Sequence, residues 1–196
     1  MIALRWSHGA TNGAGEYRGE HAGPNNRSCP TETAAYRQAM IRSIDHVNIV
    51  VADLTRSVRF YTEVLGFRKT ADVVMEGEWI ERIIGLKGVK GLVAFVEPPD
   101  GGLRLELLEY RAPAGATLSE NSRANTIGVR HIAFRVDGIE AMAAKLRAAG
   151  VTLFSDPVKV PPGVVKFAAG DKLLCYFLDP DGVVLELCEY GRAREG

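Results

Sequence analysis

The strongest constraint on the fold of this chain is an internal duplication. Residues 45–51 (DHVNIVV) return in altered form as residues 130–136 (RHIAFRV), and both copies carry histidine at the second position. Both halves also end on a shared motif, in which Pro-Asp-Gly leads to a Leu-Glu-Leu segment. Glu106 follows His46 by 60 positions, and Glu186 follows His131 by 55 positions. Because order and spacing agree, the sequence predicts two tandem modules.

The two repeats have the same predicted secondary structure. A helix begins at Asp53 and runs to about Leu65, and its counterpart begins at Asp137, where Glu140 completes a capping box. Each helix stops at a glycine thirteen positions after its first aspartate. Three strands are predicted after each helix, near 67–75, 92–97 and 103–110 and then near 151–154, 173–178 and 183–190. The expected fold class is α+β, with βαβββ modules over 44–112 and 128–191.

Side-chain alternation assigns the polar residues to one face of each module. In the first strand Val47, Ile49 and Val51 form an apolar face, so His46 points the other way, as His131 does in the second copy. The same alternation puts the two glutamates on the faces that avoid the helices. If the first and fourth strands are neighbours, two imidazoles and two carboxylates meet in one concavity, a set suited to a divalent metal. Taken singly, each would be an ordinary solvated strand residue.

Composition narrows the function classes. The 24 Lys and Arg residues balance the 24 Asp and Glu residues without a run of like charge, which argues against nucleic acid or an anionic membrane as partner. No apolar segment is long enough to span a bilayer. Three cysteines without a CxxC motif suit a reducing cytosol, so we expect a cytoplasmic protein that acts on a small molecule.

The first 40 residues differ from the rest of the chain. Residues 1 to about 30 are rich in Gly, Asn and Ser and lack an apolar period, so we expect a flexible N-terminal arm over 1–40 and a globular domain over 41–196. A short helix is possible over 31–39. Met40 is either an alternative translation start or part of an arm that packs on a partner subunit.

The repeated motifs resemble those of the vicinal oxygen chelate superfamily, which includes glyoxalase I, methylmalonyl-CoA epimerase, extradiol dioxygenases and bleomycin-resistance proteins. The resemblance covers about residues 44–191. It rests on Asp-His-Val at 45–47, Leu-Gly-Phe at 65–67, Glu-Leu-Leu-Glu at 106–109, His-Ile-Ala-Phe at 131–134 and Asp-Pro-Asp-Gly at 179–182.

The resemblance implies a half-open β cup around one metal, with four ligands: His46, Glu106, His131 and Glu186. The ion would be Zn, Ni, Co, Mn or Fe(II), and a homodimer is expected because members commonly dimerise, some by exchanging modules. The implied reaction is that of a metal-dependent lyase or isomerase of glyoxalase or epimerase type. It chelates a carbonyl-bearing substrate through neighbouring oxygens and abstracts an adjacent C–H proton. Glu186 is the expected base, with Glu106 sharing the work on the opposite face.

Family branches differ at positions that can be compared here. Glyoxalase I usually has Arg four residues after the first ligand and Asn four residues after the second, both for glutathione, whereas this chain has Val50 and Tyr110. Methylmalonyl-CoA epimerases resemble the chain around His131 but often carry Gln where Glu106 stands. The alternatives are an Fe(II) extradiol-type dioxygenase, in which a fourth ligand would crowd the iron, and a non-enzymatic antibiotic-binding protein, which would generally lack a complete ligand set.

Overall fold

A computed structural model describes residues 43–117, 121–161 and 171–191. The expectations for the arm over 1–40, the helix over 31–39 and Met40 lie outside these residues. The described residues belong to one compact unit, Ser43–Gly196. Within them, no helix is long and apolar enough to cross a membrane.

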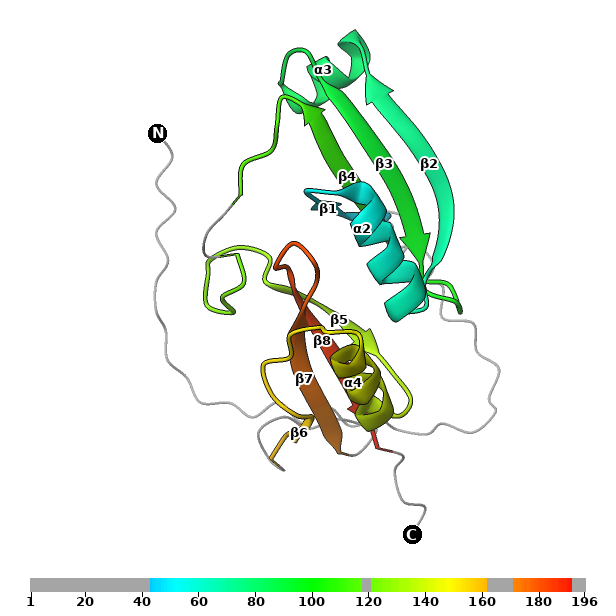
Figure 1. Cartoon of the computed structure of the whole chain (residues 1–196), viewed down its shortest axis with the longest axis vertical. Coiled ribbons are helices and arrows are strands. Elements are labelled where there is room, and N and C mark those ends of the chain that lie inside the picture. Colours follow the sequence, from blue (N-terminus) through cyan, green and yellow to red (C-terminus); the bar gives the residue numbers. More distant parts are fainter. Residues whose placement is uncertain (1–42, 118–120, 162–170, 192–196) are drawn as a thin grey trace, which may run out of the picture. The chain divides into compact units, whose positions relative to one another are not determined.

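The first module is a four-stranded sheet in the order β1-β4-β3-β2 (Figure 1). β1 pairs in parallel with β4, and the other neighbours are antiparallel. Its elements are β1 (His46–Val50), α2 (Leu54–Arg59), the π-helical turn η1 (Phe60–Val64), β2 (Arg68–Glu76), α3 (Glu78–Ile84), β3 (Lys90–Glu97) and β4 (Arg104–Ala112). The helix α3, between β2 and β3, was not predicted.

The second module repeats this topology in the order β5-β8-β7-β6. Its elements are β5 (His131–Arg135), α4 (Ile139–Ala148), β6 (Val158–Lys159), β7 (Lys172–Leu178) and β8 (Val184–Tyr190). The strand predicted near 151–154 is wrong, because that segment makes only an isolated bridge between Leu153 and Phe177, and the short strand β6 comes later. The predicted α+β fold of two βαβββ modules is confirmed.

The helix predicted to begin at Asp53 forms, and its last turn widens. Asp53 is the N-cap, with Oδ1 accepting from Arg56 N at 3.0 Å. At the other end, Leu65 N donates to Phe60 O, five residues back, as in a π-helix. Gly66 then takes a positive φ of 81°, which ends the helix.

The capping box predicted for the second helix is wrong. The N-cap is Gly138, whose φ is 84° and which has no side chain to cap with. Instead, the carboxylate of Glu189 on β8 accepts from Gly138 N at 2.8 Å and from Ile139 N at 3.0 Å. A residue distant in sequence therefore satisfies the first amides of α4.

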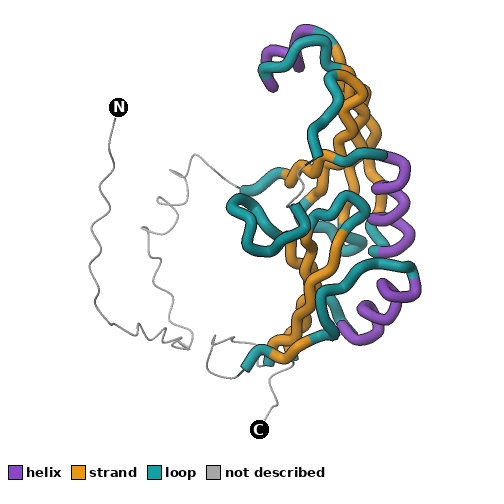
Figure 2. Tube along the Cα trace, turned by 60° about the vertical axis from the view of Figure 1, so that its left-hand side comes forward, coloured by secondary structure: helices purple, strands orange, loops and turns teal. Residues whose placement is uncertain are grey.

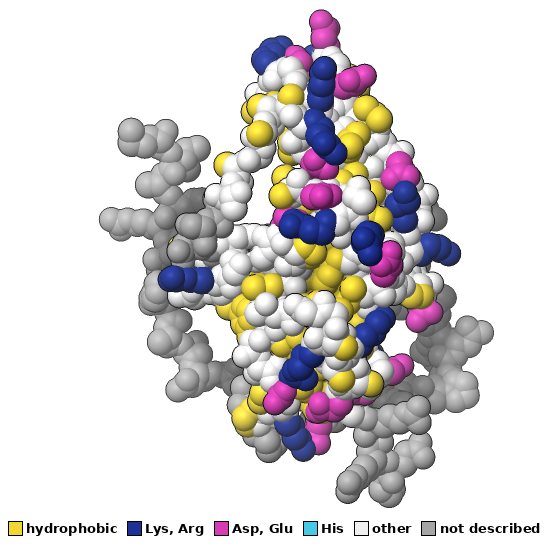
Figure 3. Space-filling view, in the orientation of Figure 1, with side chains coloured by type: hydrophobic (Ala, Val, Ile, Leu, Met, Phe, Trp, Pro, Cys, Tyr) yellow, Lys and Arg dark blue, Asp and Glu magenta, His cyan; other side chains and the backbone are white. Residues whose placement is uncertain are grey.

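One face of each sheet is covered by a helix, and the other face carries the histidine and the glutamate. In both modules the helices α2 and α4 cover one side of the strands (Figures 1 and 2). A shared apolar core lies there and includes Ile49, Leu105, Phe177 and Leu187. The histidine and glutamate positions alternate with these residues, so they lie on the opposite faces, as predicted. On the helix-covered side, acidic and basic surface residues are interspersed (Figure 3).

The second module contacts the first through the turn before β8. Asp181 accepts hydrogen bonds from Ala52 N at 3.2 Å and from Ser57 Oγ at 3.1 Å, and it forms an ion pair with Arg56. Tyr61 Oη donates to Asp179 Oδ2 at 3.2 Å. This turn therefore lies against the end of β1 and the start of α2.

Candidate metal centre

The first of the four predicted ligand residues, His46, lies at the start of β1 and is paired with Glu106 on the adjacent strand β4. His46 Nε2 is 3.3 Å from Glu106 Oε2, with the two side chains 39% and 19% exposed. The other ring nitrogen, Nδ1, is 2.8 Å from Asp45 Oδ2. Asp45 also pairs with Arg104 at 2.6 Å, so its carboxylate is held in place.

Asp45 has a role that sequence reasoning did not assign. If His46 Nδ1 carries the ring proton and donates it to Asp45, the Nε2 lone pair faces Glu106. Two acceptors 3.3 Å apart need a cation or a proton between them. A carboxylate behind a histidine is also the usual arrangement that orients a metal ligand. The only signal in the sequence was that Asp45 directly precedes His46.

The second pair has the same geometry in a more buried setting. His131 Nε2 is 3.4 Å from Glu186 Oε2, and the Glu186 side chain is only 5% exposed. The remaining oxygen, Oε1, is 3.1 Å from Lys172 Nζ on β7. The His131 ring packs on Tyr176 at a centroid distance of 5.1 Å. Lys172 was not predicted as part of the site.

Each pair has the spacing of two ligands on one metal ion. Ligands held about 2.1 Å from a common ion at roughly 90–110° are about 3.0–3.4 Å apart. The observed 3.3 and 3.4 Å match this spacing, and imidazole with carboxylate is a suitable donor set. Each module therefore presents one His–Glu pair whose spacing is compatible with two ligands of one ion.

The chain does not bring the four residues into one cluster. Among the residues that the structure describes, no group of three or more His, Cys, Asp or Glu side chains is positioned to hold an ion. The contact between modules explains the separation. Ala52, which touches the turn before β8, is six residues beyond His46, or about 20 Å along an extended strand. His131, by contrast, pairs with Val184 directly after that turn.

Three further side chains lie near the His–Glu pairs. Asn48, two residues after His46 on β1, donates from Nδ2 to Glu106 Oε2 at 2.9 Å. Arg135 is exposed and its guanidinium stacks over Tyr190. Cys188 is buried on the Glu186 face, and burial raises the pKa of its thiol, so the neutral form is favoured.

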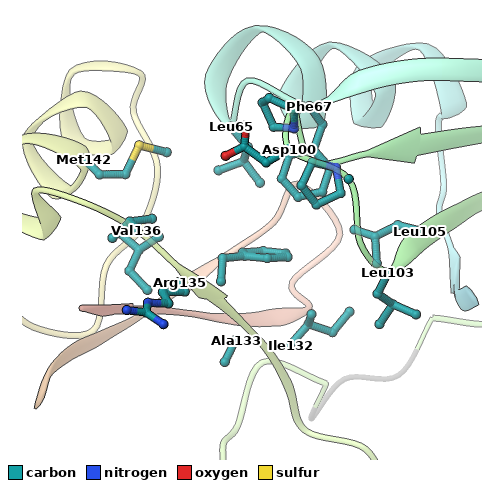
Figure 4. Close-up of a pocket in the computed structure, with 15 residues that line it drawn as sticks. Leu65, Phe67, Asp100, Leu103, Leu105, Ile132, Ala133, Arg135, Val136 and Met142 are labelled. Atoms are coloured by element: carbon teal, nitrogen blue, oxygen red, sulfur yellow. The ribbon is translucent and has the colours of Figure 1, made fainter. Parts of the chain in front are cut away.

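A cavity of about 410 Å³ lies between the modules, and none of the four predicted ligands lines it (Figure 4). Leu65 and Phe67 of the first module line it opposite Val136 and Met142 of the second. Asp100, which corresponds to Asp181 in the repeat, is exposed at its edge. In a fully symmetric chain, the turn at Asp100 would contact the second module as the turn at Asp181 contacts the first. The cavity occupies the place of that missing contact.

Comparison with known proteins gives one family. The model described as the glyoxalase/bleomycin resistance protein/dioxygenase superfamily matches residues 43–187. The chain is 33% identical over 149 residues to a 2-epi-5-epi-valiolone epimerase from Actinomyces sp, covering 74% of this chain and 78% of that protein. It is 30% identical over 153 residues to a lactoylglutathione lyase from Haemophilus influenzae, covering 77% of this chain and 95% of the relative.

A solved structure supports the same assignment. A glyoxalase family protein from Bacillus cereus aligns with a TM-score of 0.67 at 27% sequence identity. The alignment covers 79% of this chain and 97% of the solved one. Both modules are therefore included in the likeness.

Proposed function

Because the chain belongs to the glyoxalase/bleomycin resistance protein/dioxygenase superfamily, we propose that it is a metal-dependent lyase or isomerase acting on a carbonyl-bearing small molecule. The observation that carries this proposal is the repeated His–Glu pair, with Nε2–Oε2 separations of 3.3 and 3.4 Å. The relatives named as an epimerase and a lyase are about 30% identical, and both names fit a reaction at a carbon beside a carbonyl.

Four residues would hold the ion: His46, Glu106, His131 and Glu186. When bound, a divalent cation stabilises the negative charge that builds on the carbonyl oxygen as the neighbouring C–H proton leaves. Side chains behind both histidines support this role, because Asp45 contacts Nδ1 of His46 and Tyr176 packs on the His131 ring.

A carboxylate close to the reacting carbon must accept the C–H proton. We assign this role of general base to Glu186, with Glu106 acting on the opposite face. Glu186 is the more buried of the two, and Lys172 holds its Oε1, so its position is fixed before substrate binds. Glu106 is more exposed and accepts from the neutral amide of Asn48. The two carboxylates thus have different surroundings, as expected if they take different parts in the proton transfer.

One ion needs both pairs, and the separation of the pairs within a chain supports a site completed by a second copy. In the proposed homodimer, His46 and Glu106 of one subunit face the second module of its partner. A dimer then has two such sites and binds one ion per chain.

The first experiment combines metal analysis with proton exchange. We expect about one divalent ion per chain in the purified or reconstituted protein and its loss in the His46→Ala, His131→Ala double variant. The metal-loaded protein should exchange the C–H proton of hemithioacetals or thioesters with D2O, followed by NMR. Glu186→Gln should slow this exchange by about 100-fold or more while retaining fold. If no ion binds even after reconstitution, a ligand-sequestering protein becomes the better assignment.

A further inference from the structure

The cavity between the modules runs along the free edge of β5. The sheet order β5-β8-β7-β6 leaves β5 with a single neighbour, β8. Residues 132–136 all line the cavity, although their side chains alternate between the two faces of the strand. A cavity that reaches consecutive residues of both kinds must lie along the strand edge. One wall of the cavity is therefore backbone.

The backbone groups at this edge are not used within the sheet. Val136 N donates to Cys188 O at 2.9 Å, and in a parallel ladder alternate residues turn their N–H and C=O groups to opposite edges. The backbone groups of Ala133 and Arg135 therefore point away from β8. Among the described residues, none forms a hydrogen bond with them. An open edge of this kind is a template for new hydrogen bonds.

The other walls are apolar and come from both modules. The rings of Phe67 and Phe134 meet edge to face across the junction, with centroids 5.3 Å apart. Leu65, Leu103 and Met142 complete these walls (Figure 4). Aromatic rings in this arrangement accept a further ring, and a methionine side chain adapts to its shape. The walls therefore suit a flat apolar molecule.

Size and charge narrow the class of ligand further. A volume of about 410 Å³ at an interface between modules is within the usual range for sites of small molecules. Of the described lining residues, only Asp100 and Arg135 are charged, one of each sign. Both are exposed, and the Arg135 guanidinium stacks over the Tyr190 ring at 5.3 Å. The cavity therefore favours a neutral ligand.

We propose that this cavity binds a neutral aromatic molecule with one hydrogen-bond donor and one acceptor side by side, as in a lactam or an aryl amide. The ring packs against Phe67 and Phe134, and the polar groups bond to the edge of β5 at Ala133 and Arg135. None of the proposed metal ligands lines the cavity, so this is a separate site. Because both modules form it, the ligand binds only when they are packed and stabilises that packing.

The test is a titration of the full chain, free of metal, followed by amide NMR. The probes are 2-quinolinone, 3-methyl-2-quinolinone and 1-methyl-2-quinolinone, of which the last lacks the N–H donor. We expect the first two to bind with dissociation constants of about 1 mM or tighter and to shift the amide signals of Ala133 and Arg135. The 1-methyl isomer, equal in size to the 3-methyl one, should bind about fivefold more weakly.

Hydrogen exchange on the same protein tests the free edge directly. The amides of Ile132 and Phe134, which bond to β8, should exchange slowly, and those of Ala133 and Arg135 should exchange rapidly until 2-quinolinone slows them. If the latter pair is protected without a probe and loses that protection on dilution, a second copy of the chain covers the edge. That result would overturn the proposal.

Cavity-filling variants identify where the probe binds. Met142→Trp should abolish binding of 2-quinolinone, whereas Met142→Leu, which conserves volume, should retain it. Leu103→Trp fills the cavity from the first module and serves if Met142→Trp does not fold. Binding that survives in a folded filling variant, or equal affinity for the two methyl isomers, contradicts the proposal. The probe comparison and hydrogen exchange need no variant, so they decide the question if neither filling variant folds.

Discussion

Glu109 and Glu189, at equivalent positions in the two repeats, accept hydrogen bonds from amides at the start of α2 and α4. Leu54 N donates to Glu109 Oε2 at 2.9 Å, and Gly138 N and Ile139 N donate to Glu189. Local sequence rules predicted the first cap correctly through Asp53 but assigned the second to Asp137 and Glu140. The real partner is about 50 positions away, so no pattern within a helical turn could indicate it.

Glu189 should make the stability of the folded protein depend on pH, and replacing it should remove this contribution. Hydrogen bonds from Gly138 N and Ile139 N lower the pKa of Glu189. A carboxyl group with a lower pKa in the folded state stabilises the protein above its unfolded pKa, and this stability is lost as pH falls through the folded value. Glu189→Gln should therefore lower the urea midpoint near neutral pH, with the difference from the unmodified protein shrinking below about pH 4. Glu140→Gln is the control. A difference that is the same at every pH would contradict this.

At the scale of elements, the turn before β8 joins the modules and its counterpart does not. Asp181 contacts Ala52, Arg56 and Ser57, whereas Asp100 in the equivalent turn is exposed at the edge of the cavity. The sequence explains the difference, because the repeat replaces Arg56 with Glu140, whose charge would repel Asp100. The turn at Asp181 is therefore held against the first module by an ion pair with Arg56, whereas the turn at Asp100 makes no equivalent contact among the described residues.

Asp181→Ala should destabilise the protein by about 2–4 kcal/mol, because it leaves the buried Ser57 hydroxyl and an arginine without their acceptor. Asp100→Ala is the matched control and should change the unfolding free energy by less than about 0.5 kcal/mol. Chemical denaturation of both variants provides the measurement. Equal effects at the two positions would mean that the turn contact contributes little.

At the scale of the whole molecule, side-chain alternation and the internal duplication were enough to predict the two modules and the faces of their strands. They did not predict which side chains meet across neighbouring strands. The βαβββ modules and the faces of the predicted ligands follow from period two and from the duplication. Lys172 could not be found in this way, since it meets Glu186 only through the register of β7 and β8. Nor could the separation of the two His–Glu pairs, which depends on how the modules pack.

Mixing two inactive variants tests where the site is completed. In a homodimer with sites shared between subunits, a mixed dimer of His46→Ala and His131→Ala chains contains one site with both histidines and one with neither. We expect refolded mixtures to regain up to about one quarter of the metal binding, because half of the dimers are mixed by random association. Each variant alone is the control. If mixing restores nothing while exchange of subunits is demonstrated, the four ligands must meet within one chain.

The crowding around Gly91 has a consequence for how such a protein can change over evolution. Gly91 has the register position on β3 that Lys172 has on β7. A Cβ at Gly91 would lie 2.9 Å from Met75 Cε and 3.1 Å from Leu108 Cδ1, so a charged side chain there requires both neighbours to shift. The second repeat carries a lysine at the same point. New substrate preferences should therefore arise by exchanges in the second repeat, and laboratory selections for altered specificity would be best directed at β5 and β7.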